Sequence, residues 1–169
     1  MPDRFGPLKI LLVDDQPGNL LAMESLLRQP GREFHKAQSG REALELLLRH
    51  EFALALLDVQ MPEMDGFELA ELMRGTERTR SVPIIFVTAG AHSAVSTFRG
   101  YDSGAVDFLH KPVDPYVVES KVQVFLDLAR KSRLVQIQLW ETQKALEERD
   151  AALAKAREAL QLRDEFLSI

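Results

Sequence analysis

The sequence predicts an α/β fold, in which a five-stranded parallel sheet is doubly wound and a long C-terminal helix extends into a coiled coil. Three observations predict it. Short apolar runs alternate with segments of helical periodicity, as β-α repeats require. The runs are continuously apolar, which is typical of strands covered on both faces. Beyond Pro112 the pattern is helical to the last residue.

The first two β-α units lie within residues 9–50. KILLV at residues 9–13 is the first predicted strand, and residues 18–28 form a helix. A weaker strand at residues 34–37 precedes a helix at residues 39–50, for which Ser39 is the expected N-cap. The side chains expected to face inward are Leu20, Leu21, Met23, Leu26 and Leu27 in the first helix and Ala43, Leu44, Leu46, Leu47 and Leu48 in the second.

The other predicted strands are FALALL at residues 52–57, PIIFV at residues 83–87 and a short run at residues 106–109. Asp65 and Gly66 open a helix that reaches about Arg74. The remaining predicted helices are a poorer one at residues 92–101 and a final one that starts near residue 115. The residues expected to give the final helix an inward face are Val117, Val118, Val122, Phe125, Leu126, Leu128 and Ala129.

Length and composition predict one core with an appendage. A chain of 169 residues with 46% hydrophobic content buries one ordinary domain, which we place at residues 1–130, followed by a coiled-coil helix at residues 131–169. The lack of cysteine excludes disulfides and thiolate metal sites and suits a reducing compartment, so we expect a cytoplasmic protein. The apolar run near the start is too short for a signal peptide or a membrane span.

Charge is distributed unevenly along the chain. The net charge of −5 lies entirely in residues 1–115, whereas residues 116–169 carry equal numbers of acidic and basic side chains. No segment has the clustered basic residues that neutralise a phosphate backbone, so we do not expect nucleic-acid binding. An acidic site that attracts a cation fits this distribution better.

Polar residues stand where the predicted strands end. The first strand ends in Asp14 and Asp15, the third in Asp58, the fourth in Thr88, and the fifth is followed by Lys111. In open α/β sheets the functional crevice lies at the carboxyl ends of the strands. Taken singly, each residue has an ordinary structural explanation. One of the first two acids could cap a helix, Asp58 could lie in a turn, Thr88 could be a satisfied strand-end hydroxyl, and Lys111 could be a solvated surface charge. Their joint placement favours a site.

Three carboxylates at one edge repel one another unless they share a cation, and hard oxygen ligands suit Mg²⁺ or Mn²⁺. A carboxylate beside such an ion and a lysine ammonium can attack a phosphoryl group in line. We therefore expect Asp58 to form an acyl phosphate, with Thr88 donating a hydrogen bond to a phosphoryl oxygen. The four histidines lack metal-ligand spacing and are interpreted as structural or solvated: His35, His50, His92 and His110.

The motifs VDDQPGN, LLDVQMPEMDGFEL, VTAG and GYDSGAVDFLHKPV resemble, in order and spacing, those of the response-regulator receiver domain, over about residues 7–130. The resemblance implies a flavodoxin-like sheet with strand order 2-1-3-4-5 and a two-component phosphorelay. Asp58 would be the phosphoacceptor, and a phosphohistidine in a histidine kinase or phosphotransfer protein would be the donor. Asp15, Asp58 and the Gln60 carbonyl would bind Mg²⁺, and Asp14 would hold a metal-bound water.

The resemblance also assigns Thr88 and Lys111 to the phosphoryl group and implies a cis bond between Lys111 and Pro112. Phe108 stands where the family has a rotating aromatic residue, so it is the expected switch residue together with Thr88. Gln60 and Gly90 occupy positions that tune the lifetime of the phosphoryl group in the family.

Leucine recurs every seven residues in the last part of the chain, the period of a left-handed coiled coil. We expect a parallel homodimer along this seam, although a lone helix folded back onto its own domain is an alternative. The seam residues are Leu139, Leu146, Leu153, Leu160 and Leu167, with Thr142, Arg149, Ala156 and Arg163 at the companion core positions.

The final residues, LRDEFLSI, are similar to the entry into the dimerisation helix of histidine kinases, so we expect a truncated histidine-kinase parent. A diguanylate cyclase or a protein phosphatase as the output is the alternative. A phosphohydrolase is disfavoured because Gln60 stands where it would need a second acid. A flavin- or dinucleotide-binding protein is disfavoured because no glycine-rich phosphate loop follows the first strand.

Overall fold

The computed structural model describes residues 6–89 and 107–169. Five parallel strands form one sheet in the order β2-β1-β3-β4-β5, which confirms the predicted fold and strand order. The predicted helix at residues 92–101 lies outside the described residues. The elements are β1 (Leu8–Val13), α1 (Pro17–Leu27), β2 (Arg32–Ala37), α2 (Gly40–Arg49), β3 (Leu54–Asp58), α3 (Gly66–Gly75), β4 (Ile84–Ala89), β5 (Asp107–Lys111) and α5 (Pro115–Leu167).

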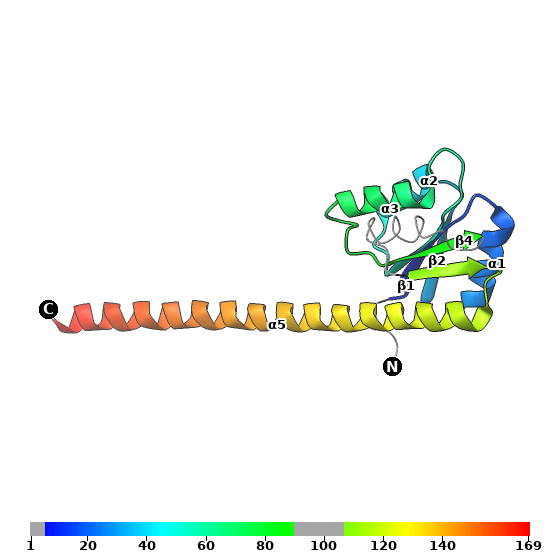
Figure 1. Ribbon diagram of the computed structural model, residues 1–169. Coiled ribbons are helices and arrows are strands. Elements are labelled where there is room, and N and C mark those ends of the chain that lie inside the picture. The colour runs from blue at the N-terminus through cyan, green and yellow to red at the C-terminus, as the bar shows by residue number, and fades with distance from the viewer. Residues whose placement is uncertain (1–5, 90–106) are drawn as a thin grey trace. The chain divides into compact units, whose positions relative to one another are not determined.

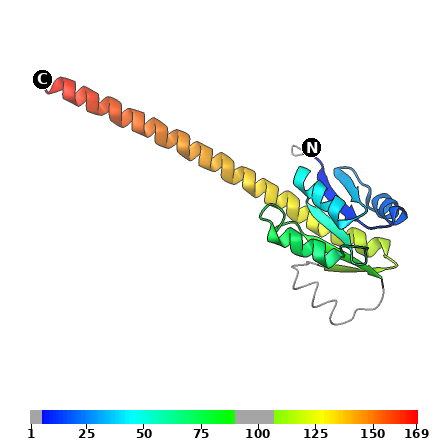
Figure 2. The ribbon, with the colours of Figure 1, turned by 90° about the horizontal axis from the view of Figure 1, so that it is seen from above.

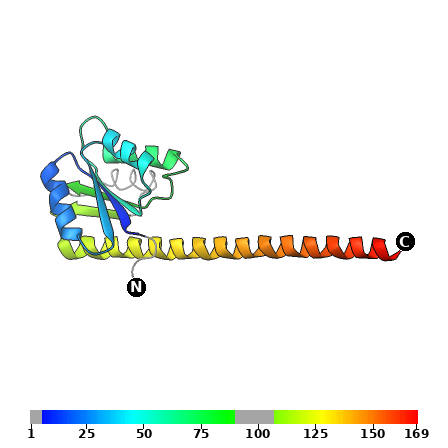
Figure 3. The ribbon, with the colours of Figure 1, turned by 180° about the vertical axis from the view of Figure 1, so that it is seen from behind.

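Helices cover both faces of the sheet. α2 and α3 lie over one face, and α1 lies over the other together with the first turns of α5 (Figures 1 and 3). Successive residues of a strand point to opposite faces, so each apolar run supplies both layers at once. This arrangement explains why the three central strands, β1, β3 and β4, are largely apolar, whereas the edge strands β2 and β5 carry several charged residues.

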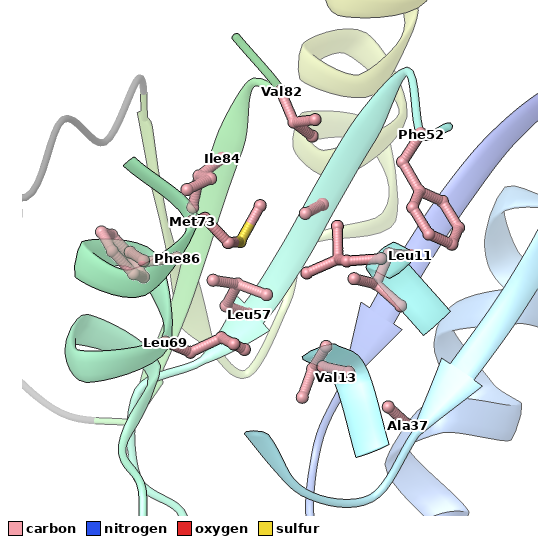
Figure 4. Packing of buried hydrophobic residues seen from close by; sticks show 14 of the residues in the cluster. Leu11, Val13, Ala37, Phe52, Leu57, Leu69, Met73, Val82, Ile84 and Phe86 are labelled. Atoms are coloured by element: carbon pink, nitrogen blue, oxygen red, sulfur yellow. The ribbon is translucent and has the colours of Figure 1, made fainter. Parts of the chain in front are cut away.

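The core on the α2–α3 face is built from alternate residues of the central strands. Leu11 and Leu57 point into it, and Phe86 meets Phe67 of α3 edge-on with ring centroids 4.8 Å apart. Figure 4 shows Leu69 and Met73 of α3 alongside Leu57 and Ile84 of the sheet. This packing holds β3 firmly between two neighbours, and β3 carries Asp58 at its end.

Four side chains expected to face inward are exposed instead. Their exposed fractions are 59% for Leu21, 70% for Leu48, 40% for Val117 and 55% for Leu128. A helix advances about 100° per residue, so only residues three or four apart reach the sheet together, as Val118, Val122 and Leu126 do. The predicted apolar faces of these helices were therefore too wide, because they included residues at their margins that face solvent.

Several boundaries also differ from the prediction. β2 begins at Arg32, two residues earlier than expected, because the Arg32 guanidinium is buried and paired with Glu119 of α5 at 2.7 Å. β3 begins two residues later than expected, although Phe52 and Ala53 are buried before it. β4 runs to Ala89, so Thr88 lies within the strand, and β5 includes Lys111.

Two predicted helix starts are confirmed by their caps. The Ser39 hydroxyl accepts a hydrogen bond from the backbone of Glu42 at the start of α2. Asp65 and Glu68 form a reciprocal capping box at the start of α3. The cap of α3 fixes the end of the loop that follows Asp58.

The chain divides into two compact units, Met1–Asp127 and Leu128–Ile169. α5 runs from Pro115 to Leu167 without a break, as Figure 2 also shows, which confirms the predicted continuous helix. In the second unit the seam leucines are exposed, with fractions from 44% at Leu153 to 68% at Leu167. Among the described residues, none of the helices is both long and apolar enough to cross a membrane.

Candidate functional site

Acidic side chains from two strands meet at the carboxyl edge of the sheet. Asp14 follows β1, and Asp58 ends the neighbouring β3. Asp14, Asp15 and Asp58 each place a carboxylate oxygen within 4.8 Å of the other two. Asp14 and Asp58 are only 8% and 5% exposed, whereas Asp15 is half-buried. The predicted convergence of these three acids is therefore confirmed.

The Asp14 carboxylate is held by polar groups from α1 and its preceding turn. It accepts hydrogen bonds from the backbone N–H of Gln16 at 2.9 Å and from the Asn19 side-chain amide at 3.2 Å. The N-cap of α1 is Gln16, whose side chain makes no capping bond, so neither of the two acids is the cap residue of this helix. Sequence analysis did not identify Asn19 as a site residue, although its position in the first turn of α1 places it close to the end of β1.

Lys111 of β5 reaches across the end of β4 to the same acids. Its ammonium lies 3.3 Å from an Asp14 oxygen and 3.4 Å from an Asp58 oxygen. Burial lowers the pKa of Lys111, but the charges of Asp58 and Asp14 outweigh it and raise the pKa overall. Lys111 therefore stays charged and bridges the two carboxylates.

Burial and the charge of Asp14 raise the pKa of Asp58, although Lys111 and a hydrogen bond from the Gln60 backbone oppose that rise. The single positive charge of Lys111 thus neutralises only part of the negative charge of Asp14 and Asp58. In the described part of the chain, no ion pair involves Asp15. Three hard oxygen donors with excess negative charge fit a small divalent cation such as Mg²⁺.

The remaining predicted site residues lie close by in sequence or in the sheet. Thr88 follows Val87, which is the register partner of Asp58 in β4, and is itself half-buried. Phe108 of β5 packs against the core, with its ring centroid 5.4 Å from that of Phe86. The bond between Lys111 and Pro112 is cis, as expected. Gly90 lies outside the described residues.

Asp14 and Asp58 line a cavity of about 320 Å³ between α1 and the sheet. Asp14, Asn19, Asp58 and Lys111 form its polar end. Its walls are apolar and come from α1, β1, β3, β4 and the turn after β5. The site therefore combines charged side chains at one end with an apolar lining. The apolar lining lowers the local dielectric constant, which strengthens electrostatic interactions between the charged groups.

His35 and His50 are built into the structure away from these acids. Their rings lie 4.2 Å apart beside Phe52, His35 contacts Glu33 at 2.6 Å, and His50 contacts Lys9 at 3.2 Å. Their surroundings agree with the structural interpretation. His92 lies outside the described residues.

The raised pKa of Asp58 predicts a stability effect that depends on pH. Because the folded state holds the Asp58 proton more tightly than the unfolded state, stability falls as pH rises above the usual value of 3.8 and levels off above the folded pKa. Without metal at neutral pH, we expect Asp58→Asn to stabilise the fold by about 1 kcal/mol.

Urea denaturation in a chelating buffer measures this difference. The advantage of Asp58→Asn over wild type should shrink as pH falls toward 3.8. Acidic side chains remote from Asp58 have the same surroundings in both proteins, so their contribution cancels in the comparison. An advantage that stays constant across this range would contradict the assigned cause.

The sequence profile of the response regulator receiver domain matches residues 10–123. The chain is 36% identical over 126 residues to a probable cyclic di-GMP phosphodiesterase of Vibrio cholerae, and 36% identical over 118 residues to the transcriptional regulatory protein SrrA of Staphylococcus aureus. These alignments cover 75% and 70% of this chain but only 28% and 47% of the two relatives.

Solved receiver structures have the same fold. A response regulator receiver domain protein from Methanospirillum hungatei is 30% identical, with a TM-score of 0.68, and the match covers 75% of this chain and 99% of that one. The receiver domain of a signal transduction histidine kinase from Syntrophus aciditrophicus is 32% identical, with a TM-score of 0.65, over 70% of this chain and 89% of that one.

Proposed function

Because this chain belongs to the response regulator receiver domain family, we propose that it takes a phosphoryl group from a phosphohistidine onto Asp58 and passes the signal through α5 to an output domain. The observation that carries the proposal is the approach of Asp14, Asp15, Asp58 and Lys111 at one edge of the sheet. Histidine kinases are the source of phosphoryl groups for receiver domains, so the donor is a histidine kinase or a phosphotransfer protein.

Each side chain has a distinct part in the proposed transfer. An Asp58 carboxylate oxygen attacks phosphorus, the bond to the donor imidazole nitrogen breaks, and the electron pair leaves with that nitrogen. Lys111 lies against the nucleophile and is positioned to neutralise charge on a phosphoryl oxygen. Thr88 donates a hydrogen bond to the same group, and Phe108 repacks against Phe86 in response.

Asp15, Asp58 and the backbone carbonyl of Gln60 would bind Mg²⁺ or Mn²⁺, with Asp14 holding a metal-bound water. The bound cation would neutralise charge on the phosphoryl oxygens. The chain's own contribution is to hold the acids in place before binding. Asn19 and the Gln16 backbone orient Asp14 for this purpose.

We assign residues 1–130 to the receiver and residues 131–169 to a signalling helix that pairs in parallel with a second copy. The seam from Leu139 to Leu167 is apolar and exposed, which supports burial against another helix. We place both the receiver and this helix in the cytoplasm, where the donor kinases act.

We propose a histidine kinase as the output, supported by the final LRDEFLSI and by the similarity to a receiver domain of a signal transduction histidine kinase. A cyclic-dinucleotide enzyme is the alternative, and the similarity to a probable cyclic di-GMP phosphodiesterase supports that class. A diguanylate cyclase belongs to the same class, and a protein phosphatase would use the same helix. Sequence that continues beyond Ile169 distinguishes these outputs.

Acetyl phosphate with Mg²⁺ tests the proposed chemistry. We expect intact-protein mass spectrometry to show one added phosphoryl group that hydroxylamine removes, as an acyl phosphate requires. Chelation of the metal should prevent the addition. An adduct that forms equally well with a chelator, or that resists hydroxylamine, would contradict the proposal.

A further inference from the structure

The second unit carries a charge pattern that the leucine seam alone does not explain. If the seam leucines occupy heptad position a, then Val135, Thr142, Arg149, Ala156 and Arg163 occupy position d. Arginine at a core position is unfavourable unless its charge is compensated, because the core of a coiled coil is desolvated. Arg149 and Arg163 therefore need acidic partners.

Neither arginine finds a partner on its own helix. On a helix, ion pairs form between residues three or four apart, and the residues at those distances from Arg149 and Arg163 are all leucine, alanine or phenylalanine. Asp150 and Asp164 likewise have no basic residue three or four positions away. Across the described residues 107–169, no salt bridge involves any of these four side chains.

The two aspartates stand immediately after the two arginines, at position e. Neighbours in sequence do not face each other on a helix, so Arg149 cannot pair with Asp150 of the same chain. In a parallel pair of helices, however, the d residue of one helix packs beside the e residue of the other. Arg149 would then meet Asp150 of a second copy, and Arg163 would meet Asp164 of that copy.

The opposite orientation leaves the arginines uncompensated. In an antiparallel pair the d residue packs beside the partner's g residue, and position g holds Gln138, Ala145, Ala152, Ala159 and Phe166, none of which is charged. The same uncharged g positions leave Asp150 and Asp164 without the usual g-to-e′ partners. Only the parallel, in-register arrangement satisfies all four charges.

We infer that the second unit pairs in parallel and in register with a second copy of this chain, and that reciprocal Arg149–Asp150 and Arg163–Asp164 ion pairs between the helices select this arrangement. The inference rests on the dimer of the proposed function and deepens it, because it names the residues that set orientation and register. The two ion-pair layers are 14 residues apart, or two heptads, so a shift of one heptad would break all four pairs and a shift of two heptads would leave only two.

Complementary charge reversals in the full chain test the inference. One variant combines Arg149→Glu and Arg163→Glu, and the other combines Asp150→Lys and Asp164→Lys. In sedimentation equilibrium without Mg²⁺ or phosphodonor, we expect each variant alone to dimerise at least about tenfold more weakly than wild type, and their mixture to recover a heterodimer of wild-type affinity. The matched control is Lys144→Glu with Lys155→Glu, at positions f and c, which should dimerise like wild type.

A single cysteine tests the orientation. The chain has no cysteine, so Thr142→Cys at position d introduces the only thiol. We expect it to form a disulfide with its own counterpart under mild oxidation, which requires a parallel pair. A dimer that resists this cross-link, charge variants that dimerise like wild type, or a mixture that does not recover would overturn the inference.

These outcomes differ from a failure of the proposed function itself. A wild-type chain that stays monomeric at all concentrations would end both the proposed dimer and this inference. A dimer that ignores the charge reversals would end the inference alone. Phosphorylation of Asp58 is measured separately and is unaffected by either result.

Discussion

Asp58→Asn is expected to abolish phosphoryl uptake from acetyl phosphate, which is the largest effect on activity that the site predicts. Asparagine keeps the shape of the side chain, but its amide is not a nucleophile toward phosphorus. The Lys111 contact with Asp14 does not involve Asp58, so the rest of the site should persist. Intact-protein mass after incubation with Mg²⁺ and acetyl phosphate should show a single adduct for wild type and none for the variant.

Neighbouring substitutions identify the acceptor. Asp14→Asn and Asp15→Asn should slow uptake by about tenfold or more through weaker metal binding, while a higher Mg²⁺ concentration restores part of it. Glu71→Gln, on the exposed side of α3, should match wild type. An adduct that persists in Asp58→Asn and disappears in Asp14→Asn would move the acceptor to Asp14.

The position of the acids could be predicted because the carboxyl ends of parallel strands lie along one edge of the sheet, independently of how the side chains pack. Asp14, Asp15 and Asp58 stand at the ends of strong apolar runs, so a boundary shifted by one residue does not move them off that edge. Lys111 ends the shorter and more polar β5, whose carboxyl end lies along the same edge. The same reasoning placed Thr88 near the site, although it lies inside β4 rather than after it.

The parts that sequence reasoning missed depend on contacts across the fold. Arg32 looks like a loop charge until its partner Glu119, 87 residues away, is known. Asn19 reads as an ordinary polar residue of a first helical turn until its amide is seen on Asp14. Leu21 and Leu48 are leucines beside buried leucines, and periodicity alone does not say which edge of the stripe meets the sheet.

The backbone approach at Gly66 is a further contact of this kind, and it predicts the largest loss of stability. Gly66 is the first residue of α3, and its backbone N–H donates to the Val59 carbonyl at 3.0 Å. A Cβ at this position would collide with the Asp58 carbonyl oxygen and come within 3.1 Å of the Val59 Cα. These are backbone atoms of a strand end held by β4, so they cannot move aside freely.

We therefore expect Gly66→Ala to lower the free energy of unfolding by about 3 kcal/mol, measured by urea denaturation with circular dichroism. It should also slow phosphoryl uptake by at least about tenfold, because the collision displaces Asp58 itself. Two control glycine-to-alanine substitutions near the starts of other helices separate this steric effect from the effect of helix propensity. For Gly40→Ala the nearest atoms belong to the Met64 side chain, whose flexible thioether can rotate away, so a loss of about 1 kcal/mol is expected.

Gly18→Ala meets nothing within 4 Å and should stabilise the protein by about 0.5–1 kcal/mol, because alanine restricts the unfolded chain. The order of stability expected from packing is thus Gly18→Ala above wild type, then Gly40→Ala, then Gly66→Ala. Helix propensity alone would favour alanine at all three sites. A Gly66→Ala variant as stable as wild type would show that the loop after Asp58 can move to accommodate the methyl group. It would contradict the inference that the start of α3 is tightly packed against the site.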